Sequence, residues 1–487
     1  MASHGIDYDS SDPNSILSYG QKVVGKSARE ICELVGVPDP SSRPGWKPTK
    51  NALGDSIEAY FGIPKNNSPE PDFPLAKIEL KVLPLKKGRK ELLVKESTSI
   101  SMMDYMELVH ETWTSASVRK KLEHILFVFF VIEPIDLMTS TVRAVELWEA
   151  QEGDRAMFQI DWEGTQRKVI AGQAHHLSEE DDRVLAARRK GTGKGKDLRE
   201  QPNSTELAPS RAWALKSWFT RQILKEKVLR VPFERAYDHF LPEILASRTL
   251  DPAEQGILRL LRPLEGLTLR SVAERFGVPL DSSKNLAATI VNRSLKFQRI
   301  ESEIKEFDQL GISVKTLNLD TDTGEPYEAV SFPAMVLKDF VTERWEPTEG
   351  EEESQLRNDL HRILFVPTFH RTDEGQPDRI LGRAFFWSPS PEQWGMIQVD
   401  WERYQTAVME GMARYYVPPG WKRRTNNLPK DGETHVIHMR PHGRDSLDVD
   451  IDPKGNLVTK QCFWLNKQFV WDMVTEHAMP PPGVRHV

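Results

Sequence analysis

The sequence predicts two α/β domains of one fold, placed in tandem along the chain. At 487 residues the chain has the length of two to four ordinary domains. Alternating and apolar segments that suit strands occur together with helical segments, which is the pattern of α/β proteins. Motifs of the first half also recur in the second half in the same order. We therefore expect one domain over residues 1–230 and its copy over residues 231–487.

The internal repeat consists of pairs of short motifs. Shared composition alone would not keep such motifs in order, so the match indicates two copies of one fold. In chain order the pairs are Ile31–Pro38 with Val272–Pro279, Lys50–Asn51 with Lys284–Asn285, Ile78–Leu83 with Ile312–Leu317, Arg119–Val128 with Arg357–Val366, Asp161–Glu163 with Asp400–Glu402, and Leu215–Phe219 with Thr459–Phe463. The interval from Asp161 to Gly172 also recurs between Asp400 and Gly411.

The composition is that of an ordinary globular protein, with 39% hydrophobic and 28% charged residues. Two cysteines, Cys32 and Cys462, argue against a disulfide framework, and no Cys/His cluster has zinc spacing. The polar, acidic start Met1–Ser15 does not resemble a signal peptide, and the apolar run Ile125–Ile132 is too short to span a bilayer. We therefore expect a cytoplasmic protein that does not contact membranes. The net charge of −7 means that any DNA binding would depend on local basic clusters.

The first predicted helix begins at Ser27, which forms a capping box with Glu30, and ends at Gly36. The stretch from Gly20 to Ser27 also matches the phosphate-loop pattern of nucleotide-binding proteins. That pattern needs a buried strand before the first glycine, and residues 15–19 are short and half polar. We therefore interpret Ser27 as a helix cap and expect no nucleotide cofactor.

A strand with one apolar and one charged face is predicted from residue 78 onward. Ile78, Leu80 and Val82 would face one side, and Glu79 and Lys81 the other. Two residues along a strand span ~6.6 Å, so a carboxylate and an ammonium at this spacing can reach one phosphate. A solvated strand face with no chemical role explains the same alternation.

A second carboxylate, Asp72, stands just before this strand and follows a Pro-rich turn at residues 68–71. It can bend back towards Glu79, and two converging carboxylates offer oxygen ligands to Mg²⁺, a cation that keeps several of its waters. A neighbouring Lys81 can orient or deprotonate one of those waters and hold the attacked phosphate. The pattern therefore favours metal-dependent cleavage of a phosphodiester.

The Pro-Asp, spacer, Glu-x-Lys pattern resembles the active-site motif of the PD-(D/E)xK nuclease superfamily. Glu58 in a helical segment upstream and Lys121 before an apolar strand downstream extend the pattern. In this order and spacing, Glu58, Asp72, Glu79, Lys81 and Lys121 resemble the mismatch-repair endonuclease MutH and, more closely, the related type II restriction endonucleases that cut at GATC. The resemblance implies two restriction-endonuclease-like domains, each a mixed sheet flanked by helices.

The resemblance also implies roles for these five residues. Asp72 and Glu79 would hold Mg²⁺, and Glu58 would assist directly or through water. Lys81 would position or activate the water nucleophile. Lys121 would contact the scissile phosphate or the carboxylates.

Basic clusters supply the expected contacts to double-stranded DNA. Residues 86–90 form a basic turn, and residues 188–199 form a Gly-rich basic loop that could alternatively be a solvated linker. In the MutH family a loop at this place reads bases in the major groove, where basic forks suit guanine. By that resemblance the DNA-binding candidates are Lys50, Arg188, Lys190, Lys216 and, in the second copy, Arg440.

The second copy departs from the first at the predicted active positions. It has Asn292 for Glu58, Glu306 for Asp72, Ser313 for Glu79, Lys315 for Lys81 and Asp359 for Lys121. Because the central carboxylate is lost and an acid replaces a phosphate-facing lysine, we expect no catalysis there. The alternating acids at 448, 450 and 452 could hold a second metal or could form a solvated strand edge.

The sequence thus predicts a Mg²⁺-dependent type II restriction endonuclease, cutting at GATC by resemblance, with a catalytically inactive second copy that binds DNA as an effector. With one catalytically active site per chain, a double-strand cut requires either two monomers that pair on DNA or two successive nicks by one monomer. Two alternatives remain: a mismatch-repair nicking endonuclease, and a non-catalytic DNA-binding protein sensitive to methylation.

Overall fold

The computed structural model describes residues 7–42, 51–65, 68–87, 92–94, 96–191, 197–230, 247, 251–277, 312–347, 352–373, 376–411, 428–443 and 448–477. The chain divides into two compact units, which we call the first and second unit. The first comprises residues 1–249 with 346–353, and the second comprises 250–345 with 354–487. The expected boundary at residue 230 adjoins residues 231–246, which lie outside the described residues, so it stays a prediction. No described helix is long and apolar enough to cross a membrane.

The main sheet of the first unit has the strand order β2-β1-β4-β5. Strand β1 (Glu79–Lys87) runs parallel to β4 (His124–Val131), and β2 (Leu92–Val94) and β5 (Thr141–Glu149) are antiparallel to their neighbours. The buried run of β4 supplies the centre of the sheet, as its apolar sequence requires. The expected mixed α/β sheet is confirmed.

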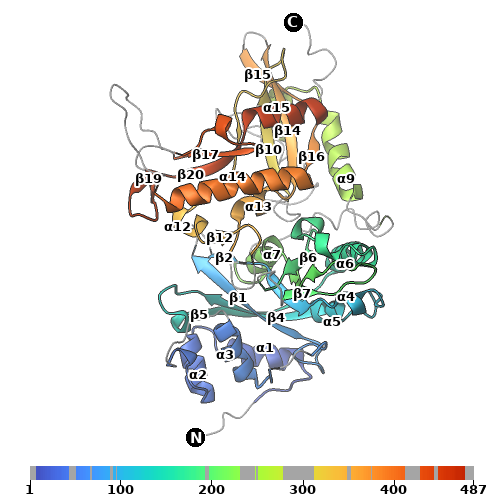
Figure 1. Ribbon diagram of the computed structural model, residues 1–487, viewed down its shortest axis with the longest axis vertical. Helices are drawn as coiled ribbons and strands as arrows, with labels where there is room; N and C mark the ends of the chain where they lie inside the picture. The colour runs from blue at the N-terminus through green and yellow to red at the C-terminus, as the bar shows by residue number, and fades with distance from the viewer. Residues whose placement is uncertain are drawn as a thin grey trace. The chain divides into compact units, whose positions relative to one another are not determined.

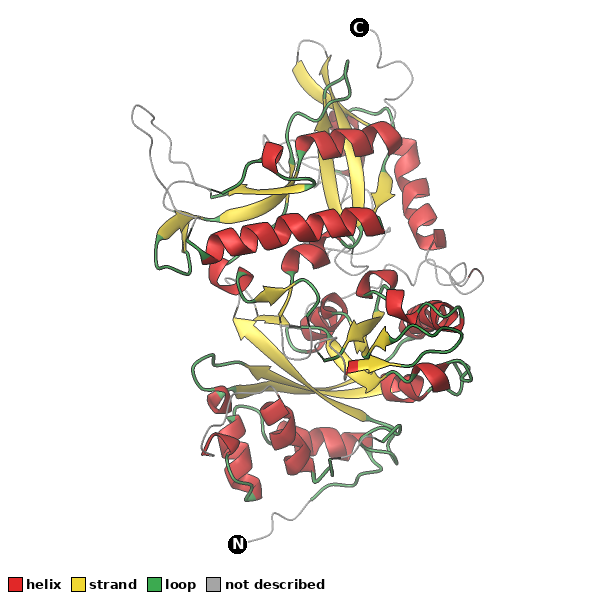
Figure 2. Ribbon diagram, in the orientation of Figure 1, coloured by secondary structure: helices red, strands yellow, loops and turns green. Residues whose placement is uncertain are grey.

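Helices cover both faces of this sheet (Figures 1 and 2). Helices α1 (Pro13–Gln21), α2 (Ala28–Val35) and α3 (Asn51–Phe61) pack on one face around a common apolar core. Ser27 caps α2 in a capping box with Glu30, as the sequence predicts. The remaining helices are α4 (Tyr105–Leu108), α5 (Ser117–Glu123), α6 (Glu152–Ile170) and α7 (Ser217–Lys227).

A second, smaller sheet of the first unit carries the start of the basic loop. Its order is β3 (Thr98–Met102), β9 (Arg211–Leu215), β6 (Leu185–Arg189), all antiparallel. The short strands β7 (Leu198–Arg199) and β8 (Ala208–Pro209) pair beside it.

The second unit repeats both sheets. Strand β10 (Ser313–Leu319) runs parallel to β14 (Ile363–Asp373), which also pairs with β15 (Gln376–Leu381) and β16 (Phe385–Trp387). The small sheet has the order β11 (Val330–Ser331), β20 (Gln461–Leu465), β17 (Ile437–Pro441). The helices are α9 (Asp251–Leu261), α10 (Leu269–Phe276), α12 (Leu337–Phe340), α13 (Gln355–Leu360), α14 (Pro391–Met409) and α15 (Lys467–His477), and the other short strands are β12 (Glu343–Arg344), β13 (Glu352–Glu353), β18 (Val449–Ile451) and β19 (Leu457–Thr459).

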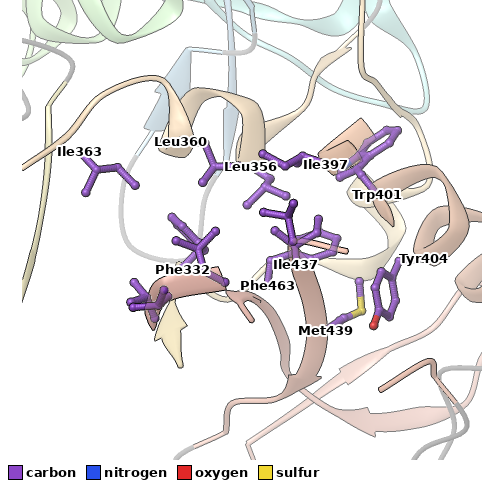
Figure 3. Packing of buried hydrophobic residues seen from close by; sticks show 14 of the residues in the cluster. Phe332, Leu356, Leu360, Ile363, Ile397, Trp401, Tyr404, Ile437, Met439 and Phe463 are labelled. Atoms are coloured by element: carbon purple, nitrogen blue, oxygen red, sulfur yellow. The ribbon is translucent and has the colours of Figure 1, made fainter. Parts of the chain in front are cut away.

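The apolar core of the second unit lies between its sheets and α14. Ile437 and Phe463 of the small sheet, with Phe332 directly after β11, face Trp401 and Tyr404 of α14 (Figure 3). These side chains are nearly inaccessible to solvent. The unit therefore has a core of its own, as expected for a complete second copy.

The strand registers show which residues of the two units correspond. Glu79 pairs with Ile125 in the first unit, and Ser313 pairs with Ile363 in the second. The shared Ile-Leu-Phe-Val strand therefore places Ser313 where the first unit has Glu79. In the small sheets the pair Leu185–Leu215 corresponds to Ile437–Leu465.

This register corrects one of the sequence pairings. Leu215 ends β9 and corresponds to Leu465 at the end of β20, not to Thr459. The two segments share a lysine and a phenylalanine at equal spacing, which produced the wrong match. Lys216 precedes a helix, whereas Lys460 precedes a strand, so only the structure separates the two positions.

Candidate active site

Asp72 lies against the start of β1 because the chain turns back on itself between residues 73 and 78. Phe73 and Ile78 exchange two backbone hydrogen bonds, of 2.9 and 3.2 Å. The turn closes through Lys77, which adopts a left-handed backbone conformation with φ of 57°. Asp72 Oδ2 then accepts a hydrogen bond from the backbone N–H of Leu80 at 2.9 Å. The carboxylate of Asp72 is thus fixed beside the residue that follows Glu79.

Glu79 is a buried carboxylate between two ammonium groups. Its side chain is 2% exposed. Oε1 accepts a hydrogen bond from Lys81 Nζ at 2.6 Å, and Lys121 Nζ lies 3.3 Å from Oε2. Lys121 reaches this point from α5, which leads directly into β4, the parallel neighbour of β1. The parallel pairing therefore brings together two lysines from distant parts of the sequence.

A cavity of about 450 Å³ opens beside this cluster. Its lining includes Glu58 from α3, Asp72, Lys81 from β1 and Arg188 from β6. Residues 96–99, which lead into β3, also line it. Glu79 and Lys121 do not line the cavity, so they would act from behind Lys81.

Glu58 is electrostatically linked to the other candidates. Burial is the main cause that raises its pKa, and the negative charges of Asp55 and Asp72 raise the pKa further. The ammonium groups of Lys65 and Lys81 partly offset this rise. A nearby cation would stabilise the ionised form of such a carboxylate, because its attraction offsets the free-energy cost of burying the negative charge.

The arrangement suits a hydrated cation better than a cage of protein ligands. Within the described residues, no three His, Cys, Asp or Glu side chains gather closely enough to hold a metal ion. Oε2 of Glu79 is nevertheless buried and accepts no hydrogen bond, and Asp72 presents a carboxylate to the cavity nearby. Mg²⁺ commonly binds through one or two carboxylates and retains waters, so Asp72, which lines the cavity, fits its chemistry, and Glu79 would join it by turning its carboxylate from Lys81 and Lys121 towards the cavity.

The DNA-binding candidates lie in different surroundings. Arg188 is almost fully buried; Nη1 donates to the carbonyl of Ser97 at 3.4 Å and Nη2 lies 3.9 Å from the Glu96 carboxylate. Lys190 and Lys216 are also buried. Lys50, residues 192–196 of the basic loop and residues 88–90 of the basic turn lie outside the described residues.

The cavity wall contains a residue that the sequence analysis did not select. Glu96 lines the cavity and is the acidic neighbour of Arg188. Its position depends on the pairing of β3 with β9 and of β9 with β6, which no local pattern reveals.

The second unit has different chemistry at the corresponding place. Lys315 is directed inward: its Nζ donates to the carbonyl of Ser331 at 2.7 Å and lies 4.8 Å from the centre of the Phe332 ring. Burial lowers the pKa of this lysine. Ser313 Oγ donates to the backbone carbonyl of Asp359 at 3.2 Å. Asn292 and Glu306 lie outside the described residues.

The structure also shows the surroundings of Arg440 and of the alternating acids at 448, 450 and 452 in the second copy. Arg440 is exposed and stacks on the Trp464 ring, 3.7 Å from its centre. The alternating acids have separate structural partners: Asp448 pairs with Lys460, Asp450 accepts from the N–H of Leu337, and Asp452 closes the turn between β18 and β19. A shared metal at these acids is therefore not supported.

The fold and the site together define a class of protein. A mixed sheet carries a carboxylate and a lysine two residues apart on its parallel strand, and a second carboxylate folds onto that strand. This is the arrangement of the PD-(D/E)xK nucleases.

Comparison with known proteins shows which proteins the chain resembles. The family model of the DNA mismatch repair enzyme MutH matches residues 61–161 and, a second time, residues 295–400. The type II restriction enzyme Sau3AI of Staphylococcus aureus is 25% identical over 489 aligned residues, which cover 94% of this chain and 97% of that enzyme. The mismatch repair protein MutH of Klebsiella pneumoniae strain 342 is 28% identical over 227 residues, 45% of this chain and 95% of MutH. The chain is therefore similar to the MutH family of endonucleases over two tandem regions, and to a type II restriction enzyme along nearly its whole length.

Proposed function

We propose that this protein is a type II restriction endonuclease that cuts double-stranded DNA at a specific site, expected to be GATC, with Mg²⁺ as cofactor, and that it acts in the cytoplasm. The main support is the placement of Asp72, Glu58 and Lys81 around one cavity, with Glu79 held directly behind Lys81. Similarity to a restriction enzyme along nearly the whole chain favours restriction over mismatch-repair nicking.

In this proposal the chain's own residues prepare a hydrated cation and a water for attack on a phosphodiester. Asp72 and Glu79 would hold Mg²⁺, with Glu58 assisting, and the bound cation would supply a more acidic water and neutralise charge on the phosphate. The Lys81 ammonium, which is held by Glu79, would position that water by donating a hydrogen bond to it, and it could activate the water as a base only after giving up its own proton. Lys121 would hold the Glu79 carboxylate in place, because its ammonium lies 3.3 Å from Oε2.

The direct test is incubation of the purified chain with plasmid DNA and Mg²⁺, with and without adenine methylation of GATC. We expect linear products that end at a fixed sequence, and no cleavage in EDTA. Nicked circles only would favour the mismatch-repair alternative. Site-specific binding without cleavage would favour a non-catalytic DNA-binding protein and would contradict the proposal.

The rise of the cleavage rate on the acidic side of the pH profile, the acidic limb, should follow the ionisation of Glu58. Because its pKa is raised, Glu58 stays protonated to a higher pH than an ordinary glutamate, and its negative charge appears only above that pKa. We expect the single-turnover rate to rise with pH through this range, and Glu58→Gln to reduce the slope of the limb. Asp55→Asn removes a charge that raises the pKa of Glu58, so it should move the limb to lower pH. A limb that neither variant changes would show that the titration of Glu58 does not control cleavage.

The second unit is proposed to lack catalysis and to bind DNA as an effector. Its Lys315 bonds to a backbone carbonyl, and Ser313 replaces the central carboxylate, whereas Arg440 remains exposed on Trp464. One active centre per chain means that a double-strand cut needs two chains that pair on DNA or two successive nicks.

Plasmids with one and with two recognition sites should therefore be cut at different rates. At limiting enzyme we expect the two-site plasmid to be cut several times faster, because one site can occupy the second unit while another is cleaved. Arg440→Ala should reduce that difference. Equal rates for both plasmids would contradict an effector role.

A further inference from the structure

The backbone of Ala187, the residue before Arg188, is held at both its N–H and its carbonyl by buried ionisable side chains. The N–H of Ala187 donates to Asp182 Oδ2 at 3.1 Å, and Arg211 Nη1 donates to the carbonyl of Ala187 at 2.7 Å. Asp182 is 2% exposed and Arg211 is 8% exposed. Because Arg188 is the next residue, these two contacts set the direction in which its side chain leaves the strand.

A third buried charge belongs to the same cluster. Lys216 is 7% exposed, and its backbone N–H donates to the carbonyl of Val184 in the segment that leads into β6. Burial raises the pKa of Asp161 and raises that of Asp182 strongly, and the Lys216 ammonium partly offsets both rises. Thr165 of α6 adds a hydroxyl contact to Asp182 at 3.3 Å. We call Asp182, Arg211 and Lys216 the charged clamp.

The second unit builds the same strands without this clamp. By the strand registers, Thr434 corresponds to Asp182, Gln461 to Arg211, and Asn466 to Lys216. All three replacements are uncharged. Asn466 Nδ2 donates to the carbonyl and to Oγ1 of Thr434, at 3.1 and 3.2 Å. A neutral pair thus joins the two positions in the second unit.

The neighbouring Asp161 differs from the charged clamp, because the second unit keeps an aspartate, Asp400, at the corresponding position. Asp161 accepts the N–H groups of Arg183, Val184 and Leu185, and Asp400 accepts those of the corresponding residues 435–437. The fold therefore requires this carboxylate. It does not require the charged clamp, and buried charges are costly compared with neutral groups of similar size.

We propose that the charged clamp positions Arg188 for DNA recognition. Asp182, Arg211 and Lys216 hold the backbone of β6 so that the Arg188 guanidinium stays in the cavity that Asp72 and Lys81 line. The clamp is present in the unit with the proposed active centre and absent where Arg440 is exposed instead. This assigns Lys216 to positioning rather than to direct DNA contact. The inference rests on the proposed function, because Arg188 must act on DNA.

The test replaces the three residues of the charged clamp in the full chain with the uncharged residues found at the corresponding positions of the second unit. The triple variant Asp182→Thr, Arg211→Gln, Lys216→Asn is compared with the unchanged chain and, in parallel, in an Arg188→Ala background. Loss of residues that orient a metal ligand commonly costs about 10–100-fold, and we expect an effect of the same order for residues that orient Arg188. We expect kcat/KM for DNA cleavage to fall by about 10-fold or more in the unchanged background and by less than about 2-fold when Arg188 is absent. Lys216→Arg keeps the charge and should restore much of the activity that Lys216→Asn loses.

Two results would overturn the inference: no loss from the triple variant, or an equal loss in both backgrounds, which would mean a general structural role. If the triple variant does not fold, as judged by thermal unfolding, Arg211→Gln alone is compared with and without Arg188→Ala in the same way. DNA affinity of the same set of proteins is also measured, by fluorescence anisotropy. If the unchanged chain cuts no DNA, the proposed function fails, and the affinity comparison still decides whether the clamp acts through Arg188.

Discussion

Lys81→Ala should lower the single-turnover rate of DNA cleavage by at least about 10²–10³, since removal of one preorganised charged group from an active site typically costs this much. The ammonium of Lys81 lies 2.6 Å from Glu79 Oε1, and Lys81 lines the cavity together with Asp72. DNA binding measured in Ca²⁺ should change far less. Glu79→Ala should have an effect of the same order.

The second unit supplies the matched control for this variant. Lys315 occupies the position that corresponds to Lys81, but its ammonium bonds to the carbonyl of Ser331 in the interior. Lys315→Met should therefore leave the single-turnover rate within about threefold, the size of a small positional effect. If Lys81→Ala cut DNA at the full rate, or if Lys315→Met abolished cleavage, the assignment of the active centre to the first unit would be wrong.

Asp161→Ala should destabilise the first unit strongly. The buried carboxylate accepts three backbone N–H groups at the start of β6, and its removal leaves these donors without partners. Each unsatisfied buried group costs ~1–3 kcal/mol, so a loss of at least ~3 kcal/mol is expected. Hydrogen exchange measured by mass spectrometry should show faster exchange across β6 and β9.

Asp400→Ala is the corresponding change in the second unit. Asp400 accepts the N–H groups of residues 435–437, so its loss should accelerate exchange in β17 and β20 and leave β6 unchanged. Each variant should thus act on its own unit. Normal exchange in β6 of the Asp161→Ala protein would show that these hydrogen bonds do not hold the strand.

The fold was largely predictable because its signals are local. Alternation from residue 78 predicted the strand that became β1, the apolar run before residue 132 predicted β4, and the capping box at Ser27 predicted the start of α2. Period and capping depend on neighbouring residues, so one sequence is sufficient to find them. The order of the repeated motifs likewise predicted two copies of one fold.

The candidate site was predictable only in part. Spacing brought Asp72 next to the Glu79 strand, but which side chains share a cavity depends on pairings between distant strands. Arg188 was expected on a loop that reads bases, and the structure places it in a buried position beside Glu96. That position depends on the registers of β3, β9 and β6, for which the sequence has no local signal.

By itself, the sequence determined the number of domains, the class of fold, the order of the acidic and basic residues, and the loss of the central carboxylate in the second copy. The tertiary structure alone decided which charges are buried, that Leu215 corresponds to Leu465, and that Lys315 is directed inward while Lys81 faces a cavity. The reason is physical: period and residue type are properties of neighbouring residues, whereas burial and register depend on packing between segments far apart in the chain.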